Sequence, residues 1–243
     1  MSLPSQIIKD IRVLHTAKGR KAANLCIAEG ERTVFTLINA GWKPAHIYTV
    51  EDTYLLTNGF TPSSPCTMVS TSIMERISPS STPSGILAVF PIPPTPLVSQ
   101  LGAGLVLAQV ADPGNMGTLI RSCTAFGYRS VVVVAGCDPF SPKVIQATAG
   151  AIAHVTLFRW TWAELLAHKG DLSLCALVAQ GGKRPEEVPL SKTLLVVGNE
   201  AHGIYAPWIA DCDAAMTLPM HGQIESLNAA VAGSIALYIG SLN

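Results

Sequence analysis

The second half of the chain alternates short apolar runs with segments of helical spacing. The apolar runs predict buried strands at residues 105–110, 130–135, 154–158, 172–179, 193–198 and 215–218. The segments between them predict helices at residues 115–126, 142–149, 161–168 and 225–238. Near-continuous apolar strands separated by helices are typical of a parallel sheet covered on both faces. Ligands bind such sheets at the carboxyl ends of the strands, so the loops that follow the strands are the first candidates for chemistry.

The N-terminal part is less regular. Its pattern predicts a helix at residues 31–40 and strands at 45–50 and 86–90, which together indicate a small α/β domain. Residues 91–96 include four prolines. Prolines at this density fit neither a helix interior nor a central strand, so this segment is predicted to be a stiff, extended connector. We therefore expect two domains, residues 1–97 and 98–243.

Composition and charge exclude two classes of protein. The chain has 243 residues, of which 49% are hydrophobic and 13% charged, with 16 basic side chains against 16 acidic ones. Intrinsic disorder requires the opposite composition. A wholly basic nucleic-acid-binding protein would carry a clear excess of lysine and arginine. A compact, nearly neutral α/β protein is the remaining expectation.

The charges are nevertheless unevenly distributed. Residues 1–97 carry 8 basic and 6 acidic side chains, a net charge of +2, whereas residues 98–243 carry 8 and 10, a net charge of −2. A basic cluster in the first part comprises Lys9, Arg12, Lys18, Arg20 and Lys21. Such a cluster is either an ordinary solvated helix face or a patch that contacts phosphates.

Several chemistries are disfavoured by what the sequence lacks. The six cysteines have no Cys-x-x-Cys spacing and mostly lie in apolar runs, which favours free thiols in a reducing cytoplasm. The apolar segment 227–239 is shorter than the roughly 20 residues of a membrane span, and no signal peptide is evident. Phosphate-binding loops, dinucleotide fingerprints, zinc-protease motifs and nucleophile elbows are absent, and the histidines have no metal-ligand spacing. We expect no metal and no membrane association.

The first loop that could carry chemistry follows the predicted strand 105–110. The sequence Asp-Pro-Gly-Asn at 112–115 favours a turn, and Asn115 is suited to cap the next helix. Arg121 lies among apolar neighbours in that helix, where a guanidinium is costly without an anionic partner. It belongs either to a structural salt bridge or to a site for an anion.

Two further loops follow later strands. In one, Gly198 and Gly203 bracket Glu200, and glycine permits close backbone approach or a positive φ. This loop is either a tight turn with a capping carboxylate or a binding loop. In the other, Ser226 and Asn228 open the last helix, and helix N-termini attract anionic groups. These side chains either cap and pack or take part in a site.

The three loops carry three motifs in order. They are Asn115-x-Gly117-x-x-x-Arg121, then Val196-x-Gly198-x-Glu200-x-x-Gly203, then Leu218-Pro219-Met220-x-Gly222-x-x-x-Ser226-Leu227-Asn228. This combination resembles the SpoU/TrmH family of RNA ribose 2′-O-methyltransferases, of the SPOUT superfamily, over residues 101–240. The first part is similar to the substrate-binding domain of that family at Lys18-Gly19-Arg20, Glu29-Gly30-Glu31-Arg32 and Ser84-Gly85-Ile86-Leu87-Ala88.

The resemblance implies an α/β fold in two parts. The C-terminal domain is expected to be a SPOUT methyltransferase domain with a mostly parallel sheet and a trefoil knot, preceded by a small N-terminal α/β substrate-binding domain. S-adenosylmethionine is the implied cofactor, and its expected contacts are Ala179, Gln180, Gly181, Gly198, Gly203, Leu218, Met220 and Leu227. The residue types agree, because glycines admit the ligand close to the backbone and Leu218, Met220 and Leu227 offer apolar surface to an adenine ring.

The implied reaction is methyl transfer to a ribose 2′-hydroxyl of structured RNA, with ribosomal RNA favoured as the target. The implied catalytic residues are Arg121, Asn115, Glu200, Ser226 and Asn228. We expect Glu200 to orient Arg121 through a bidentate pair. Arg121 would grip a phosphate and stabilise the developing alkoxide rather than accept a proton.

RNA and a second copy of the chain are the expected partners. RNA contacts are expected from Arg12, Lys18, Arg20 and Lys21. A homodimer is expected to pack through helices near the knot, and the apolar last helix is compatible with this. Three alternatives stay open: a transfer-RNA 2′-O-methyltransferase, a non-catalytic RNA-binding or ribosome-assembly protein on the same fold, and a methyltransferase with a non-RNA acceptor.

Overall fold

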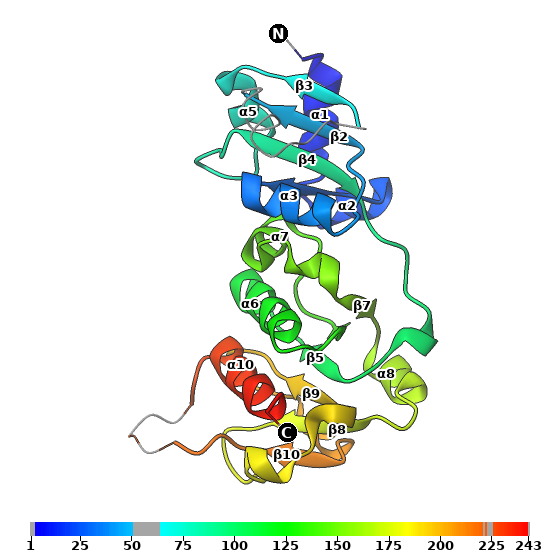
Figure 1. Cartoon of the computed structure of the whole chain (residues 1–243), viewed down its shortest axis with the longest axis vertical. Helices are drawn as coiled ribbons and strands as arrows, with labels where there is room; N and C mark the ends of the chain where they lie inside the picture. Colours follow the sequence, from blue (N-terminus) through cyan, green and yellow to red (C-terminus); the bar gives the residue numbers. More distant parts are fainter. Residues whose placement is uncertain (1–2, 51–63, 221, 223–225, 243) are drawn as a thin grey trace. The chain divides into compact units, whose positions relative to one another are not determined.

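The computed structural model divides into two compact units (Figure 1). The structure describes residues 3–50, 64–220, 222 and 226–242. Unit 1 comprises Met1–Pro93 and Asp138–Ala153, and unit 2 comprises Pro94–Cys137 and His154–Asn243. The chain therefore passes from one unit to the other after Pro93, after Cys137 and after Ala153.

Unit 1 is a four-stranded sheet with helices. Its strands are β1 (Leu25–Glu29), β2 (His46–Thr49), β3 (Cys66–Met68) and β4 (Ile86–Pro91). Its helices are α1 (Ser5–Val13), α2 (Ala17–Ala23), α3 (Glu31–Asn39), α5 (Thr71–Ile77) and α7 (Pro142–Thr148). The strand order is β1-β4-β2-β3, with β4 antiparallel to both of its neighbours and β3 parallel to β2. The predicted helix and the two predicted strands of the N-terminal part correspond to α3, β2 and β4.

The core of unit 1 forms where α1 and α5 pack on the sheet. Ile8 and Ile11 of α1, one helical turn apart, are buried with Ile73 and Ile77 of α5 against Leu87 of β4. Helix α7 packs against β1 and α3, although its sequence lies in the second half of the chain. A β-carbon added to Gly150, just after α7, would overlap the side chain of Thr36 in α3. Segment 138–153 is thus closely fitted to the N-terminal sheet.

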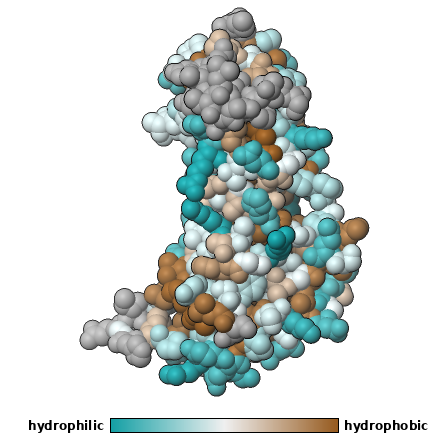
Figure 2. All heavy atoms as spheres, viewed as in Figure 1, coloured by the Kyte–Doolittle hydropathy of each residue, from teal (hydrophilic) through white to brown (hydrophobic). Residues whose placement is uncertain are grey.

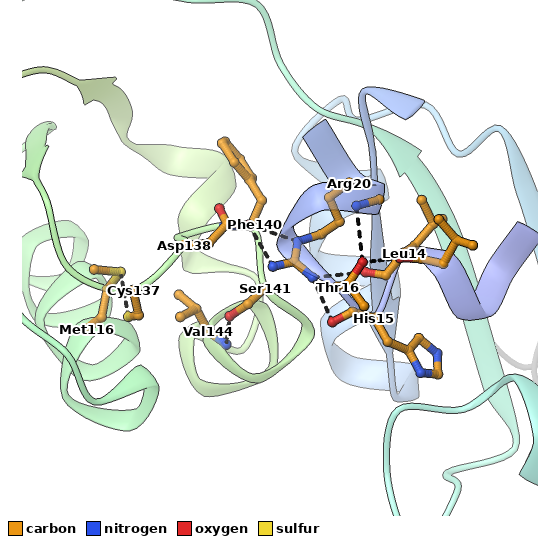
Figure 3. A network of polar contacts seen from close by, with 12 residues as sticks. Leu14, His15, Thr16, Arg20, Met116, Cys137, Asp138, Phe140, Ser141 and Val144 are labelled. Carbon is orange, nitrogen blue, oxygen red and sulfur yellow. Dashed lines mark hydrogen bonds and ion pairs between the residues drawn. The ribbon is translucent and has the colours of Figure 1, made fainter. Parts of the chain in front are cut away.

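The predicted contact between Arg20 and RNA is wrong. Its side chain in α2 is buried and donates from Nε to Asp138 Oδ2 at 2.8 Å and from Nη1 to the carbonyl oxygens of Leu14 and His15 at 2.9 and 3.0 Å (Figure 3). The ion pair with Asp138 closes at 2.7 Å. Because its donors are used inside unit 1, Arg20 is not available to RNA phosphates. Its role is to join α2 to the turn that precedes α7.

Unit 2 is a six-stranded parallel sheet. Its strands are β5 (Gly104–Ala108), β6 (Ser130–Val134), β7 (Thr156–Arg159), β8 (Ser173–Leu177), β9 (Thr193–Val197) and β10 (Ala214–Met216). The strand order is β10-β8-β9-β5-β6-β7, and every described pairing is parallel. Its helices are α6 (Pro113–Ala125), α8 (Trp162–His168), α9 (Ala206–Ala210) and α10 (Ala229–Gly240). Short 3-10 turns lie at Val98–Gln100, Ala151–His154, Pro185–Glu187 and Leu190–Lys192. The predicted α/β class with a mostly parallel sheet is confirmed, while the knot stays a prediction.

The two faces of this sheet are covered by different helices. Alternate strand residues, among them Val106, Val132 and Val196, form one core with Trp162 and Leu165 of α8. On the other face α6 and α10 pack together, and a β-carbon added to Gly233 of α10 would overlap the side chain of Leu119. Ser122 and Ser234 also share a hydrogen bond of 2.7 Å between these helices. The apolar runs of the sequence are therefore strands buried on both sides.

Two predicted helix starts were wrong. The cap of α6 is Asp112, whose carboxylate accepts the N–H of Asn115 at 2.7 Å, so Asn115 lies inside the first turn. Helix α10 begins at Ala229 rather than in the 225 region, because Asn228 is extended and caps the N–H groups of Ala230 and Val231. Residue 225 itself lies outside the described residues.

Cys26, Cys123, Cys175 and Cys212 are free thiols. Burial raises the pKa of Cys26 and of Cys123 to about 12, which keeps these thiols protonated and unreactive. Across residues 3–50, 64–220, 222 and 226–242, no helix is long and apolar enough to cross a membrane.

Candidate functional site

The three loops singled out in the sequence meet at the carboxyl edge of the parallel sheet. The first links β5 to α6, the second links β9 to α9, and the third leads from β10 to α10. Strands β9 and β5 are neighbours, so the first two loops leave the sheet side by side. The site that results is built within unit 2.

Glu200 holds the first loop in place. Its two carboxylate oxygens accept the backbone N–H groups of Ala111 and Asp112, each at 3.1 Å, and the side-chain amide of Asn115 at 3.0 Å. Desolvation of the Glu200 carboxyl raises its pKa, but hydrogen bonds from Asn115 and from backbone N–H groups outweigh this, so the pKa lies below its ordinary value. The carboxylate is therefore ionised at neutral pH and acts as an acceptor.

A chain of side-chain amides extends this arrangement to the third loop. Asn228 donates from Nδ2 to Asn115 Oδ1 at 3.0 Å, and Asn115 donates in turn to Glu200. At the same time, the side-chain oxygen Oδ1 of Asn228 caps α10 by accepting the N–H groups of Ala230 and Val231. The structure thus brings Asn115, Glu200 and Asn228 together, one from each motif, and fixes the orientation of both amides.

Asn199 completes the second loop and was not among the predicted residues. Its Nδ2 donates to the carbonyl oxygen of Gln109 at 3.0 Å, while its Oδ1 accepts the N–H groups of Ala201 and His202. Two backbone hydrogen bonds of 2.9 Å also join Asn199 to Gly203. Asparagine side chains often close turns by hydrogen-bonding to nearby backbone groups. The sequence Gly198-Asn199 could therefore have indicated this role.

A cavity of about 260 Å³ lies beside this network. Six of the eight predicted cofactor contacts line it: Ala179, Gly198, Gly203, Leu218, Met220 and Leu227. Gln180 and Gly181 do not line it. Glu200 and Ser226 line the cavity as well. Lining residues that the sequence did not single out are Leu177, Val178, Val197, Asn199, Ala201, Ala229 and Ala232.

Arg121 differs from its expected setting. It is exposed on α6, and within the described part of the chain its guanidinium has no hydrogen bond or ion pair. The expected bidentate pair with Glu200 is wrong, because the Glu200 carboxylate is already used by three donors of the first loop. An exposed guanidinium without a partner among the described residues is suited to hold an external anion.

The other basic side chains of the predicted patch are exposed. Arg12 lies on α1, and Lys18 and Lys21 lie on α2. All three belong to unit 1 and have no ion pair among the residues that the structure describes. No group of three or more His, Cys, Asp or Glu side chains with metal-binding geometry occurs in these same described ranges.

Two family models match the chain. Residues 103–238 match the SpoU rRNA Methylase family, and residues 5–88 match the MRM3-like substrate binding domain. The chain is 31% identical over 242 residues to the 23S rRNA (guanosine(2553)-2′-O)-methyltransferase RlmP of Bacillus subtilis (strain 168), covering 98% of this chain and 96% of that protein.

Solved structures of similar proteins agree in fold along the whole chain. A TrmH-family protein from Porphyromonas gingivalis superposes with a TM-score of 0.87 at 29% identity, covering 99% of this chain and 98% of the other. The AdoMet-bound rRNA methyltransferase from Sinorhizobium meliloti superposes with a TM-score of 0.86 at 25% identity, covering 99% and 95%.

Proposed function

Because the chain belongs to the SpoU rRNA methylase family, we propose that it transfers a methyl group from S-adenosylmethionine to a ribose 2′-hydroxyl of ribosomal RNA. The observation that carries this proposal is the cavity at the carboxyl edge of the sheet, bordered by the network of Asn115, Glu200 and Asn228. A non-catalytic RNA-binding protein would not require three motif loops tied to one another around a cavity.

The residues of the cavity fit the proposed cofactor. Leu218, Met220 and Leu227 provide apolar surface for an adenine ring. Gly198 and Gly203 leave the backbone of the second loop accessible to a ligand, and Ser226 adds a hydroxyl. When bound, S-adenosylmethionine supplies a methyl group activated by its sulfonium centre.

The side chains around the cavity have separate roles in this proposal. Glu200, ionised and fully engaged, positions the first loop rather than acting as a base. Asn115 and Asn228 keep the first and third loops in register. The free guanidinium of Arg121 binds an RNA phosphate and stabilises the alkoxide that develops at the ribose.

The test of the proposed function is a map of 2′-O-methyl positions in total RNA. Cells with and without the gene are compared, and the purified protein is then given the unmodified RNA with radiolabelled S-adenosylmethionine. We expect one ribosomal RNA ribose to lose its methyl group in the deletion strain and to regain it in vitro. A lost position in transfer RNA would change the substrate, label that resists nuclease treatment would indicate a non-RNA acceptor, and no lost position would overturn the proposal.

Unit 1 is proposed to bind the RNA substrate. Replacing Arg12, Lys18 and Lys21 together by Gln should weaken RNA binding and reduce the slope of log affinity against log salt by up to about 0.9 per phosphate contact removed. Lys43→Gln, an exposed change elsewhere in unit 1, serves as the control and should leave the slope nearly unchanged. Filter binding at several salt concentrations measures both. An unchanged slope in the triple variant would mean that RNA is held elsewhere.

We also propose that the protein acts as a homodimer. On α10 and just after it, Val231, Ile235, Tyr238 and Leu242 are 46%, 39%, 50% and 67% exposed. The spacing of four and three residues places Val231, Ile235 and Tyr238 on one face of the helix. Figure 2 shows hydrophobic side chains gathered over α10, a surface that a second copy would remove from water. RNA as substrate and the free thiols are both consistent with action in the cytoplasm.

The proposed dimer can be tested with substitutions on α10 that should halve the mass of the protein in solution. Val231→Lys combined with Ile235→Lys should convert the dimer to a monomer, because two charges would be buried at the contact without partners. Sedimentation velocity at several concentrations measures this. The exposed change Leu166→Lys on α8 is the control and should leave the mass unchanged. A wild-type protein that sediments as a monomer at all concentrations would overturn the dimer.

A further inference from the structure

In unit 2, a group of three aromatic rings ends in an exposed tyrosine. Trp162 of α8 and Trp208 of α9 stack with ring centroids 4.8 Å apart and an interplanar angle of 10°. Tyr205, which caps α9, meets Trp208 edge-on at 5.7 Å and 89°. Tyr205 is 57% exposed, whereas Trp162 is buried. We call Trp162, Trp208 and Tyr205 the aromatic stack.

The base of the aromatic stack is fixed. Trp162 donates from Nε1 to Asp211 Oδ2 at 2.8 Å, which ties the first turn of α8 to the end of α9. Trp162 also belongs to the main core of the parallel sheet, with Trp208 packed against it. The ring of Tyr205 therefore packs against Trp208, which is itself held in place by Trp162. Little side-chain entropy remains to be lost when another ring packs on it.

The position of Tyr205 follows from the chain itself. The loop 198–203 doubles back through the two hydrogen bonds between Asn199 and Gly203, and Gly203 lines the cavity. The buried Ile204 comes next and then Tyr205. Two residues span at most about 7 Å, so the Cα atom of Tyr205 lies within about 7 Å of that of Gly203. Trp162 follows β7 at the same carboxyl edge of the sheet.

We infer that Tyr205 is a stacking platform for an unpaired base of the RNA substrate, next to the nucleotide that receives the methyl group. This rests on the proposed function. Sequence-specific recognition of RNA mostly uses unstacked bases laid on aromatic side chains. An exposed tyrosine ring on a rigid support has this property, and it projects from the same loop that carries Glu200. A nucleotide held there would set which ribose can reach the cavity.

The test compares three variants of Tyr205 in the full chain. The probe is an unmodified 23S rRNA transcript, with its affinity measured by filter binding and methyl transfer measured in parallel from radiolabelled S-adenosylmethionine. Tyr205→Ala should weaken RNA affinity roughly 5- to 150-fold, the range for loss of one stacked base. Tyr205→Phe keeps the ring and should restore affinity, whereas Tyr205→Leu keeps apolar surface without the ring and should resemble Tyr205→Ala.

Controls separate this inference from the function on which it rests. The affinity for S-adenosylmethionine and the melting temperature should be the same in all three variants, and Leu166→Ala on α8 should bind RNA like the wild type. Equal RNA affinity in Tyr205→Ala and the wild type would overturn the platform. Full rescue by Tyr205→Leu would also overturn it, since that outcome indicates an apolar contact with another protein or a second copy. Absence of methyl transfer by the wild type would overturn the proposed function alone, because RNA binding is read separately.

Discussion

Arg121→Ala is expected to reduce methyl transfer at least 10²- to 10³-fold while leaving the affinity for S-adenosylmethionine within a few-fold of the wild type. The reason is that the Arg121 guanidinium is exposed and has no partner among the described residues, so its removal leaves no buried carboxylate unpaired. Its contribution therefore belongs to the RNA phosphate and to the developing alkoxide. Single-turnover methyl transfer and calorimetric titration with the cofactor measure the two effects.

Two further variants sharpen this expectation. Arg121→Lys keeps the charge but not the planar fork, so it should recover part of the rate. Asp112→Ala removes the cap of α6, and it should lower stability by about 0.5–2 kcal/mol. Loss of cofactor affinity in Arg121→Ala would assign the arginine a structural role.

Gly198→Ala is expected to abolish detectable binding of S-adenosylmethionine. A β-carbon there would overlap the backbone of Gly203 and lie 2.5 Å from the backbone nitrogen of Ile204. Backbone atoms cannot rotate away as a flexible side chain can. The loop must open, which breaks the hydrogen bonds between Asn199 and Gly203 and displaces Glu200 from the first loop. Calorimetric titration should show at least a 100-fold loss of affinity, about 2.7 kcal/mol.

Gly203→Ala is the matched control. Nothing lies within 4 Å of a β-carbon at Gly203, so the only cost is that of an alanine at φ +66°. That cost is about 1–2 kcal/mol of stability. If Gly198→Ala bound the cofactor no worse than Gly203→Ala, the closed form of the loop would not be required for binding.

The parallel sheet could be predicted because its strands are buried on both faces. In strand β6 the buried residues 131–134 are all valine, which leaves a strong signal in the sequence. The N-terminal unit gave less signal. Strand β3 has three residues and helices α2 and α5 have seven each, so their periodicity is too short to identify. Their stability comes from tertiary packing.

The site could be predicted as a set of residues but not as a set of contacts. The motifs identified Asn115, Glu200 and Asn228, which lie together. Their pairing was not predictable, because Glu200 can satisfy backbone donors as well as a guanidinium. Arg20 shows the same limit. A basic residue in a basic cluster suggests a solvated face, whereas its partner Asp138 lies 118 positions away in the sequence.

Because residues 138–153 belong to the N-terminal unit, this unit cannot be exchanged between proteins as one continuous segment of sequence. An N-terminal unit transplanted at the proline-rich connector would lose α7, expose the surface of β1 that α7 covers and leave Arg20 buried without Asp138. An unpaired buried charge costs about 3–5 kcal/mol, a large fraction of the stability of a small domain. A chimaera with a different N-terminal unit therefore has to bring its own version of this insert with it. The gene segment that encodes the N-terminal unit is in this sense discontinuous.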